Sequence, residues 1–577
     1  MLTLTLRKYL RPYKRSVWLV LLLLLVQAIA NLYLPTLNAE LINNGVVKGD
    51  IGYILRSGLI MLAASGLVII ASVVLAYLSS RVSMGFGRDL RRDVFTAVES
   101  FSARELNHFG APSLITRNTN DVQQVQMVLF LGLTMMLGAP ITGIGAVIMA
   151  LRTNVRLSAL LLVAVPLMAI MILFLLRRVV PLFRSMQLKI DRINLVLREQ
   201  ISGVRVIRAF VKTKHEEARF DLANTDLTRT TLTVTRTFAI MFPSLTLILN
   251  LSSVAVIWFG GKLVNSGQMP IGNLTAFLAY IMQILVSVMM AVMMSLMIPR
   301  AEASAERIME VLDTESSVID AVNPKAPVVK NGRIEFRDVE FRYPGAEQAV
   351  LSGITFTAEP GQVTAIVGGT GSGKSTLVNL IPRFIDVTGG SLMLDGIDIR
   401  EQSLEEVWSG IGLVPQRAFL FGGTIAENLR YGDPQATDED LWRALEIAQA
   451  KDFVDDLADK LSSHVAQGGT NLSGGQRQRL SIARAIVKNP RVFILDDSFS
   501  ALDYSTDSKL RAALASAASG ATMIVIAQRI STILGADQII VLENGLMAGL
   551  GTHQELMNDS ATYREIVLSQ LSPDEAA

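Results

Sequence analysis

Six apolar stretches in the first 300 residues restrict the fold of this chain more than any other feature. They lie near residues 16–38, 55–79, 127–151, 156–177, 239–262 and 275–299. The hydrocarbon core of a bilayer takes about 20 predominantly apolar residues per helix. The sequence therefore predicts an all-α domain with six membrane spans and long intracellular helices over residues 1–312.

The rest of the chain has the composition of a soluble α/β protein. Half of the 577 residues are hydrophobic and the mean hydropathy is +0.42, but the apolar residues are concentrated before residue 300. Residues 313–332, which include Pro324 and Pro327, lack periodicity and are typical of a linker. Strand-like runs follow at 333–336 and 339–343, so we expect a second domain over 333–577.

Composition excludes several kinds of chemistry. The chain has no cysteine and only four histidines, which excludes disulfides and thiolate zinc sites and argues against a catalytic transition-metal site. The net charge of +2 does not suggest a nucleic-acid partner. The first apolar stretch is longer than the core of a signal peptide and no clean cleavage site follows it, so we expect it to remain as a span.

Basic residues predict the orientation in the membrane. They are frequent in 7–15, 81–104 and 177–214, whereas the loops 39–54, 152–156 and 262–274 are short and hold few charges. The positive-inside rule then places both termini in the cytoplasm, as expected for a multi-pass protein of the cytoplasmic membrane. The long inside segments are helical in pattern at 86–106 and 185–210. They would form either a separate subdomain or helical hairpins that contact another domain.

A few polar side chains interrupt the spans, namely Gln27, Asn31, Asn38, Asn250 and Gln283. Such residues face a cavity or form hydrogen bonds between helices, and the sequence favours neither alternative. The sixth span is rich in methionine, a flexible side chain that suits surfaces accepting many apolar shapes. These methionines fall on several helix faces and cannot all line one cavity; they are Met282, Met289, Met290, Met293, Met294 and Met297.

A glycine-rich loop in the second domain predicts a nucleotide site. It satisfies the pattern GxxxxGK[ST], follows an apolar strand at 363–367 and precedes a helical run at 377–385. In this context backbone N–H groups surround phosphates, Lys374 reaches the terminal phosphates, and the Ser375 hydroxyl is placed to bind Mg²⁺. We therefore expect ATP and Mg²⁺ as ligands. The loop consists of Gly368, Gly369, Thr370, Gly371, Ser372, Gly373, Lys374, Ser375 and Thr376.

A second motif, which ends in a carboxylate, lies downstream of the glycine-rich loop. Residues 492–495 are apolar and end at Asp496, which is typical of a buried strand that delivers a carboxylate to Mg²⁺. Between the two motifs lies the string Leu-Ser-Gly-Gly-Gln, which contributes Ser473, Gly474, Gly475 and Gln476. This order resembles the ATPase of ABC transporters. The resemblance implies that two such domains enclose two nucleotides, each between the phosphate loop of one domain and the LSGGQ of the other.

The same resemblance implies further roles. Tyr343 resembles the aromatic residue that stacks on adenine, and Gln416 resembles the glutamine that contacts Mg²⁺ or water and faces the membrane domain. Residues 500–503 match the loop that crosses to the partner. The first half of the chain resembles the six-helix exporters that carry this ATPase in the same chain. Their coupling helices would correspond to about 107–118 and 211–220 here.

Two positions depart from the family pattern. Most members have Glu directly after the strand carboxylate, where it polarises the attacking water, and this chain has Asp497. The family's switch histidine corresponds to Gln528, which does not titrate and cannot handle protons as imidazole does. A carboxylate misplaced by about 1 Å can lower a rate on the order of a hundredfold. The site built on this phosphate loop is therefore expected to bind ATP and to hydrolyse it slowly.

This combination resembles one subunit of heterodimeric bacterial multidrug exporters. The resemblance implies a non-identical ABC half-transporter as partner, carrying the catalytic Glu and His and completed by the intact LSGGQ of this chain. It also implies ATP-driven export of hydrophobic or amphiphilic compounds through the lipid bilayer. A lipid flippase, a homodimeric exporter and a regulatory nucleotide-sensing subunit remain alternatives.

Overall fold

The computed structural model describes residues 1–295 and 297–572. These residues form two compact units. The first comprises Met1–Glu99 and Ala111–Thr314, and the second comprises Ser100–Gly110 and the chain from Glu315 onward.

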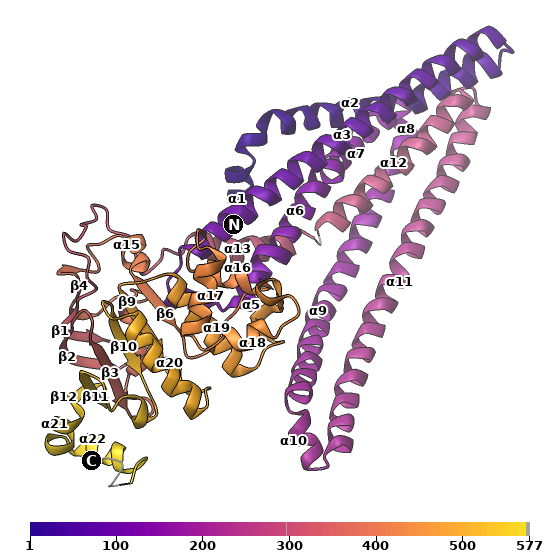
Figure 1. Ribbon diagram of the computed structural model, residues 1–577. Helices are drawn as coiled ribbons and strands as arrows, with labels where there is room; N and C mark the ends of the chain where they lie inside the picture. The colour runs from indigo at the N-terminus through magenta and orange to yellow at the C-terminus, as the bar shows by residue number, and fades with distance from the viewer. Residues whose placement is uncertain (296, 573–577) are drawn as a thin grey trace. The chain divides into compact units, whose positions relative to one another are not determined.

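The first unit is helical throughout its regular elements (Figure 1). Six of its helical stretches are long and apolar enough to cross a membrane, which confirms the predicted six spans. Short 3-10 or π turns, at Arg11–Tyr13, Leu41–Val46, Arg117–Asp121 and Gly132–Met136, interrupt the helices. The helices are α1 (Leu2–Tyr9), α2 (Lys14–Glu40), α3 (Ile51–Glu99), α5 (Ala111–Thr116), α6 (Val122–Leu131), α7 (Gly138–Thr153), α8 (Val155–Ser158), α9 (Leu161–Ser202), α10 (Val204–Ala209), α11 (Thr213–Asn265), α12 (Ile271–Ser295) and α13 (Ile298–Leu312).

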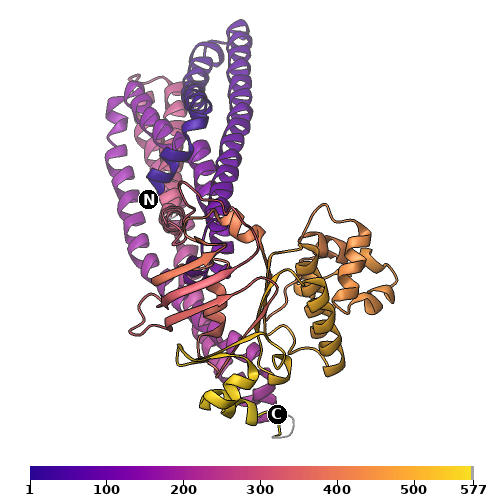
Figure 2. The same ribbon diagram turned by 60° about the vertical axis from the view of Figure 1, so that its left-hand side comes forward.

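The fourth and fifth spans belong to two very long helices, as the alternative of a helical hairpin predicts. Helices α9 and α11 lie side by side along their lengths in both ribbon views (Figures 1 and 2). They are joined at one end through α10. The tip of this hairpin carries Phe210 and Val211, which are 71% and 86% exposed. Apolar residues left so open at a turn are typical of a contact surface.

Small residues allow the spans to approach closely. A Cβ at Gly145 of α7 would lie 2.2 Å from a Leu32 methyl of α2, and one at Gly143 would lie 3.1 Å from Ser287 Cβ of α12. Helices in lipid gain association energy mainly by close packing and hydrogen bonds, so glycine at these positions brings α7 against both neighbours. The Tyr280 hydroxyl of α12 adds a 3.1 Å hydrogen bond to the Leu32 carbonyl.

The second unit is built on a six-stranded sheet in the order β12-β11-β3-β10-β9-β6. Strand β12 is antiparallel to β11, and the other neighbours are parallel. A four-stranded antiparallel sheet has the order β2-β1-β4-β5, and β7 pairs with β8. The strands are β1 (Ile334–Phe341), β2 (Leu351–Ala358), β3 (Val363–Gly368), β4 (Gly389–Leu394), β5 (Ile397–Asp398), β6 (Ile411–Val414), β7 (Gly423–Thr424), β8 (His464–Val465), β9 (Val492–Asp496), β10 (Thr522–Ile526), β11 (Gln538–Glu543) and β12 (Leu546–Gly551).

Both faces of the six-stranded sheet are buried. Alternate residues of β3, β9 and β10, such as Val367, Leu495 and Val525, join one core with the helices. Their neighbours Ile366 and Ile494 join a second core with β1, β2 and β4. This explains the uninterrupted apolar runs, because a parallel strand covered on both sides has no polar face. The helices are α14 (Lys374–Leu380), α15 (Leu404–Ser409), α16 (Ile425–Arg430), α17 (Asp438–Ile447), α18 (Lys451–Asp455), α19 (Gly474–Val487), α20 (Tyr504–Ala517), α21 (His553–Asp559) and α22 (Ala561–Leu568).

Two local predictions differ from the structure. The runs 333–336 and 339–343 form the single strand β1, with irregular register between Phe336 and Val339. The helical run predicted at 377–385 is wrong at its end, because α14 ends at Leu380. Ile381 still has helical backbone angles, but Pro382 has no N–H to donate to the preceding turn, so the helix does not continue.

The second unit includes a segment from between the second and third spans. Helix α4 (Ala103–Phe109) begins with a capping box formed by Ser102 and Glu105. The Glu105 carboxylate also accepts hydrogen bonds from the backbone and hydroxyl of Ser317, both at 3.2 Å. The Ala103 amide donates to the Phe384 carbonyl at 3.4 Å. The segment 107–118, expected as a coupling helix, covers the end of α4, α5 and the following turn.

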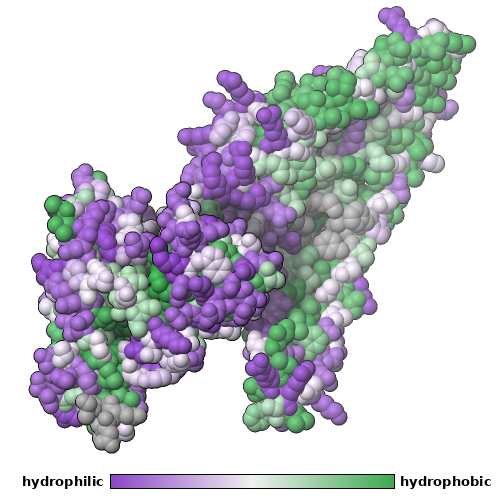
Figure 3. Space-filling model, viewed as in Figure 1, coloured by the Kyte–Doolittle hydropathy of each residue, from purple (hydrophilic) through white to green (hydrophobic). Residues whose placement is uncertain are grey.

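The two units differ in surface character. Figure 3 shows hydrophobic residues spread over α2 and α3, and mostly hydrophilic residues over the strands and helices of the second unit. Many large apolar side chains of the spans are exposed, among them Leu59 and Leu62 of α3. Such apolar exposure suits a surface in contact with lipid.

Candidate functional site

The predicted nucleotide residues gather at the carboxyl ends of four adjacent strands. The glycine-rich loop follows β3, Gln416 follows β6, Asp496 ends β9 and Gln528 follows β10. The pairing register places the ends of these strands side by side, because Ile526 of β10 pairs with both Ile366 of β3 and Asp496 of β9. In open α/β sheets this edge is where ligands bind.

Glycine is required at specific positions of the loop. Gly371 and Gly373 have φ values of 83° and 97°, a region that side-chain-bearing residues rarely adopt. A Cβ at Gly368 would lie 2.2 Å from the Leu542 carbonyl oxygen. The loop therefore keeps its backbone open on one side, as a phosphate-binding loop must, and ATP fits the residues present.

Charge at the site is concentrated on Lys374 and two carboxylates. The Lys374 ammonium donates to the Gly368 and Gly369 carbonyls at 2.8 and 2.7 Å. Burial lowers the pKa of Lys374, and the charges of Asp496 and Asp497 oppose that change. Burial and the neighbouring Asp497 charge raise the pKa of Asp496, and Lys374 acts against them. A carboxylate in such surroundings gains from a bound cation.

The candidate Mg²⁺ ligands are all oxygen donors. They are the Ser375 hydroxyl at the start of α14, the Asp496 carboxylate and the amide oxygen of Gln416. Mg²⁺ prefers such hard ligands and usually binds through one or two carboxylates together with substrate phosphates. The donor set therefore fits this ion.

The two atypical residues are in direct contact. Asp497 Oδ2 accepts a hydrogen bond from Gln528 Nε2 at 2.8 Å and another from Gln416 Nε2 at 3.2 Å. Asp497 is buried and has a φ of 47°. Its carbonyl accepts from the Ser500 hydroxyl at 2.9 Å, which ties the following turn to it. One oxygen of the shortened carboxylate is thus held by two amides from the flanking strands.

Tyr343 also reaches the phosphate loop. Its hydroxyl lies 3.2 Å from Thr376 Oγ1, and its ring packs edge-on against Phe341 with centroids 4.8 Å apart. The side chain remains 44% exposed, so a face of the ring is open beside the loop. This position is compatible with stacking on a planar base.

The LSGGQ residues form the start of a helix at the surface. Ser473 is the N-cap of α19 and forms a capping box with Gln476, with bonds of 3.2 and 2.9 Å. Ser473 and Gly474 are exposed. A Cβ at Gly475 would lie 3.2 Å from the Ala501 carbonyl, so this glycine lets the 500–503 loop approach. The structure does not join these residues to the phosphate loop through any described hydrogen bond.

Sequence reasoning missed two residues that hold the switch segment. Gln570 accepts from the Ile530 amide and donates to the Gln528 carbonyl, both at 2.9 Å. Arg529 donates to the Ser500 and Leu502 carbonyls at 3.4 Å. Arg529 stands beside the switch position and could have been suspected. Gln570 lies 42 residues from Gln528, and no local pattern marks it.

The helical unit contains a cavity of about 540 Å³ between α2, α7 and α12. Three of the predicted polar residues line it, Gln27, Asn31 and Gln283, whereas Asn38 and Asn250 are not among the lining residues. Gln283 Nε2 donates to the Asn31 carbonyl at 3.3 Å, and its Oε1 has no partner among the described residues. Gln283 therefore does both things expected of such residues: it faces a cavity and it forms a hydrogen bond between helices.

Only some of the methionines of the sixth span line this cavity, as expected from their spread over several helix faces. Met282, Met290 and Met135 are among its lining residues, and Met289 packs against the core of the unit instead. The side chains of Met293 and Met294 lie outside those described. No described lining residue carries a charge, so the cavity offers apolar surface with a few neutral hydrogen-bonding groups.

Comparisons with known proteins agree with this architecture. Residues 17–288 match the ABC transporter transmembrane region and residues 351–500 match the ABC transporter family. An "Uncharacterized ABC transporter ATP-binding protein" of Mycobacterium tuberculosis is 49% identical over 574 residues, covering 99% of this chain and 98% of the relative. The chain therefore belongs to the ABC transporter family, as a multi-pass membrane protein with its own ATP-binding domain.

Other relatives carry more specific names. A "Putative multidrug export ATP-binding/permease protein" of Bacillus subtilis is 31% identical, covering 98% of each chain. An "ATP-dependent lipid A-core flippase" of Aromatoleum aromaticum is 34% identical, covering 87% of this chain and 83% of the relative. A solved structure of a bacterial Atm1-family ABC exporter with ATP bound has a TM-score of 0.80 at 24% identity, covering 96% of this chain and 97% of the other. The fold is thus that of an ABC exporter.

Proposed function

We propose that this chain exports hydrophobic or amphiphilic compounds across the cytoplasmic membrane as one subunit of a heterodimer. Its own ATP site binds nucleotide and hydrolyses it slowly, and its LSGGQ completes the hydrolysing site of the partner. The observation that carries the proposal is the contact of Asp497 with Gln416 and Gln528.

Slow hydrolysis follows from the chemistry of these three side chains. A general base must lie within hydrogen-bond reach of the water whose proton it takes. Asp497 is one methylene shorter than the usual Glu, and two amide donors already bind one of its oxygens. These two hydrogen bonds occupy lone pairs of the oxygen that would otherwise accept a hydrogen bond from the attacking water. Gln528 supplies no titrating group in compensation.

Two surfaces support a partner subunit. The exposed Ser473 and Gly474 need a phosphate loop from another molecule, because each nucleotide in this family lies between two domains. The second unit also has a groove of about 260 Å³, lined by aromatic residues such as Phe384 and Trp408 together with Arg484 and Lys488. A partner of the same family would bring an apolar hairpin tip like Phe210–Val211 to such a groove.

The cavity of the helical unit supports the substrate class. Its neutral polar groups on an apolar background suit amphiphiles with hydrogen-bonding groups better than inorganic ions or strongly charged solutes. We place both termini in the cytoplasm from the distribution of basic residues. The proposed domains are 1–312 for transport and 333–577 for ATP binding, joined by 313–332.

The proposed cycle is alternating access. Closure of the two ATP-binding domains would draw the long intracellular helices together and turn the cavity outward. Mg²⁺ bound at Ser375, Asp496 and Gln416 would neutralise phosphate charge. Within this chain, Lys374 binds the phosphates, Tyr343 orients the base, and Ser473 to Gln476 contact the nucleotide of the partner. Hydrolysis at the partner's phosphate loop then resets the transporter.

ATP hydrolysis by the purified chain tests the proposal. We expect almost no activity from the chain alone and clear activity after co-expression with an ABC half-transporter encoded beside it. Full, drug-stimulated hydrolysis by the chain alone would replace the heterodimer with a homodimer. Nucleotide-dependent gating without vectorial transport by the complex would favour the regulatory subunit.

A lipid flippase is the second candidate. The observation in its favour is the relative named as a lipid A-core flippase, together with the uncharged, partly polar cavity. Reconstituted transport of labelled lipid compared with drug dyes separates the two. Faster movement of lipid than of any dye would make flipping the primary activity.

A further inference from the structure

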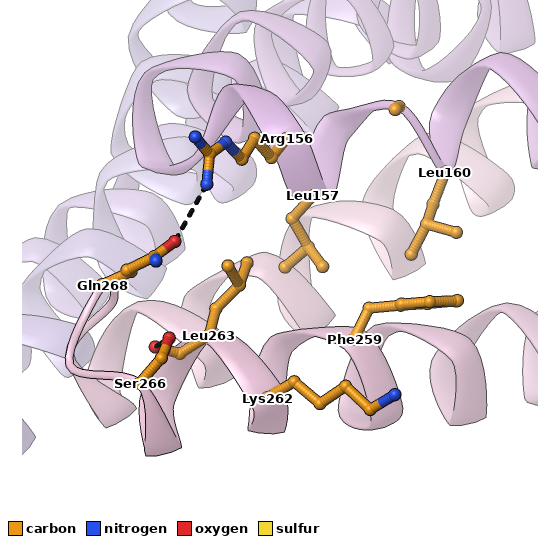
Figure 4. Close-up of a pocket in the computed structure, with 9 residues that line it drawn as sticks. Arg156, Leu157, Leu160, Phe259, Lys262, Leu263, Ser266 and Gln268 are labelled. Carbon is orange, nitrogen blue, oxygen red and sulfur yellow. Dashed lines mark hydrogen bonds between the residues drawn. The ribbon is translucent and has the colours of Figure 1, made fainter.

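A second cavity of the helical unit differs in charge from the cavity between α2, α7 and α12, which is called the transport cavity after its proposed role. It has a volume of about 520 Å³ and lies between the α8–α9 segment and the end of α11 (Figure 4). Leu157, Leu160, Phe259 and Leu263 point into the space between these helices. The basic residues Arg156 and Lys262 belong to its lining.

The two cations lack acidic partners among the described residues. Arg156 Nη1 donates to the side-chain oxygen of Gln268 at 2.9 Å, and the Lys262 ammonium lies 5.1 Å from the centre of the Trp258 ring. No ion pair between a described carboxylate and either residue is formed. The sequence has no Asp or Glu from 122 to 190 or from 227 to 301, so the parts of the α8–α9 segment and of α11 that line the cavity carry no acidic residue.

The position of the cavity suits the boundary between lipid and water. It joins the loops 152–156 and 262–274, which lie at the ends of spans and face outward in the proposed orientation. Trp258, 63% exposed, and Leu162, 78% exposed, flank it. Exposed tryptophan and basic residues at the ends of apolar helices are typical of the headgroup region.

We propose that this cavity binds an anionic phospholipid of the outer leaflet. One acyl chain would occupy the space between Leu157, Leu160 and Phe259, and the headgroup phosphate would lie at Arg156 and Lys262. The charge pattern carries the assignment, because an apolar slot with unpaired cations at its rim complements a phosphate joined to a hydrocarbon chain. A zwitterionic lipid would gain less, since its own ammonium opposes the two cations.

Native mass spectrometry of the full-length chain titrated with phosphatidylglycerol and phosphatidylcholine tests the proposal. We expect one retained phosphatidylglycerol that binds more tightly than phosphatidylcholine. The double variant R156Q/K262Q should weaken phosphatidylglycerol binding roughly tenfold to thirtyfold, because two cations near an anionic surface are lost. Equal binding of both lipids by the wild-type chain would overturn the assignment.

Matched variants separate the cavity from general surface charge. Arg152→Gln removes a cation at the same end of α7 outside the cavity lining, and should leave phosphatidylglycerol binding unchanged. The Lys262 side chain forms no described hydrogen bond, so Lys262→Gln alone can replace the double variant in the binding measurement if the double variant is unstable. A loss with Arg152→Gln as large as with Lys262→Gln would reject the site. So would displacement of phosphatidylglycerol by inorganic phosphate alone, because the acyl slot would then contribute nothing.

Discussion

In the ATP-binding unit the functional residues follow four adjacent parallel strands, whereas in the helical unit the residues of the transport cavity come from separate spans. Gln416, Asp497 and Gln528 meet because β6, β9 and β10 end at one edge of a sheet. Gln27 and Gln283 line the same cavity only because α2 and α12 pack together. The first arrangement can be recognised from local motifs, and the second cannot.

The difference also concerns how much one substitution can change. Around Asp497 a carboxylate and two amides form one hydrogen-bonded group, so we expect a change of a single methylene to affect the reaction itself. The transport cavity has dispersed apolar contacts, and each residue contributes a small part of binding. We therefore expect large effects in the ATP-binding unit and modest effects in the helical unit.

The largest effect is expected from Gly474→Asp in the LSGGQ. A Cβ at this glycine meets nothing within 4 Å, so the variant should fold, but it places a negative charge where we propose that the partner's nucleotide phosphate binds. Hydrolysis by the complex should fall on the order of a hundredfold or more, as when charge stabilisation of a transition state is lost. The measurement is steady-state ATPase activity of the co-expressed complex.

Lys374→Ala in the same chain is the matched comparison. It removes a phosphate contact of the slow site only, so the complex should keep a larger share of its activity than with Gly474→Asp. Gly474→Ala adds a side chain without a charge, so it separates the effect of added volume from the effect of the negative charge. If Lys374→Ala abolished hydrolysis while Gly474→Asp left it intact, the roles of the two sites would be reversed.

Restoring the usual catalytic pair should produce the next largest effect. Asp497→Glu with Gln528→His lengthens the carboxylate and supplies a titrating imidazole next to it. We expect hydrolysis by the chain alone to rise roughly tenfold to a hundredfold, in the range of general-base and positioning effects. Phosphate release under saturating MgATP measures the rate.

The single variants define what the increase requires. Asp497→Asn preserves size but removes the base and should give no increase. Asp497→Glu alone should give part of it, because the longer side chain can move past the amides of Gln416 and Gln528. An unchanged rate in the double variant would mean that something other than these two residues limits hydrolysis.

Sequence reasoning succeeded where physics is local. The six spans follow from apolar length, and the β3–loop–α14 order follows from a glycine pattern with one structural solution. It could not foresee that both Gln416 and Gln528 donate to the same oxygen of Asp497, because that depends on the rotamers of side chains 81 and 31 residues away from Asp497. It also could not find Gln570, whose role depends entirely on where the C-terminal helix packs.

The cavities show the same limit in the helical unit. Five intramembrane polar residues were equivalent in sequence, and only the packing of α2 against α12 separates Gln27, Asn31 and Gln283 from Asn38 and Asn250. The pairing of Arg156 with an apolar slot was likewise invisible, since a basic residue at a span end is ordinary. Helical periodicity indicates which residues share a face, and it does not indicate which helix that face meets.

The smallest effect is expected from Gln283→Leu, which tests whether the transport cavity recognises polar groups of its substrates. The substitution keeps the side chain close in size and removes the buried Oε1 that has no described partner. A substrate that donates a hydrogen bond to this oxygen should bind about tenfold more weakly, since a net hydrogen bond contributes ~1 kcal/mol and an unmet buried donor costs a further ~1 kcal/mol or less. A purely apolar substrate should bind equally well or better.

The affinity for each substrate is measured as the concentration that gives half-maximal stimulation of the ATPase activity of the complex. Asn250→Leu is the control, because it removes an amide from a span outside this cavity. If the two variants shifted every substrate alike, the polar residues would act through helix packing alone, and the cavity would select by size and hydrophobicity.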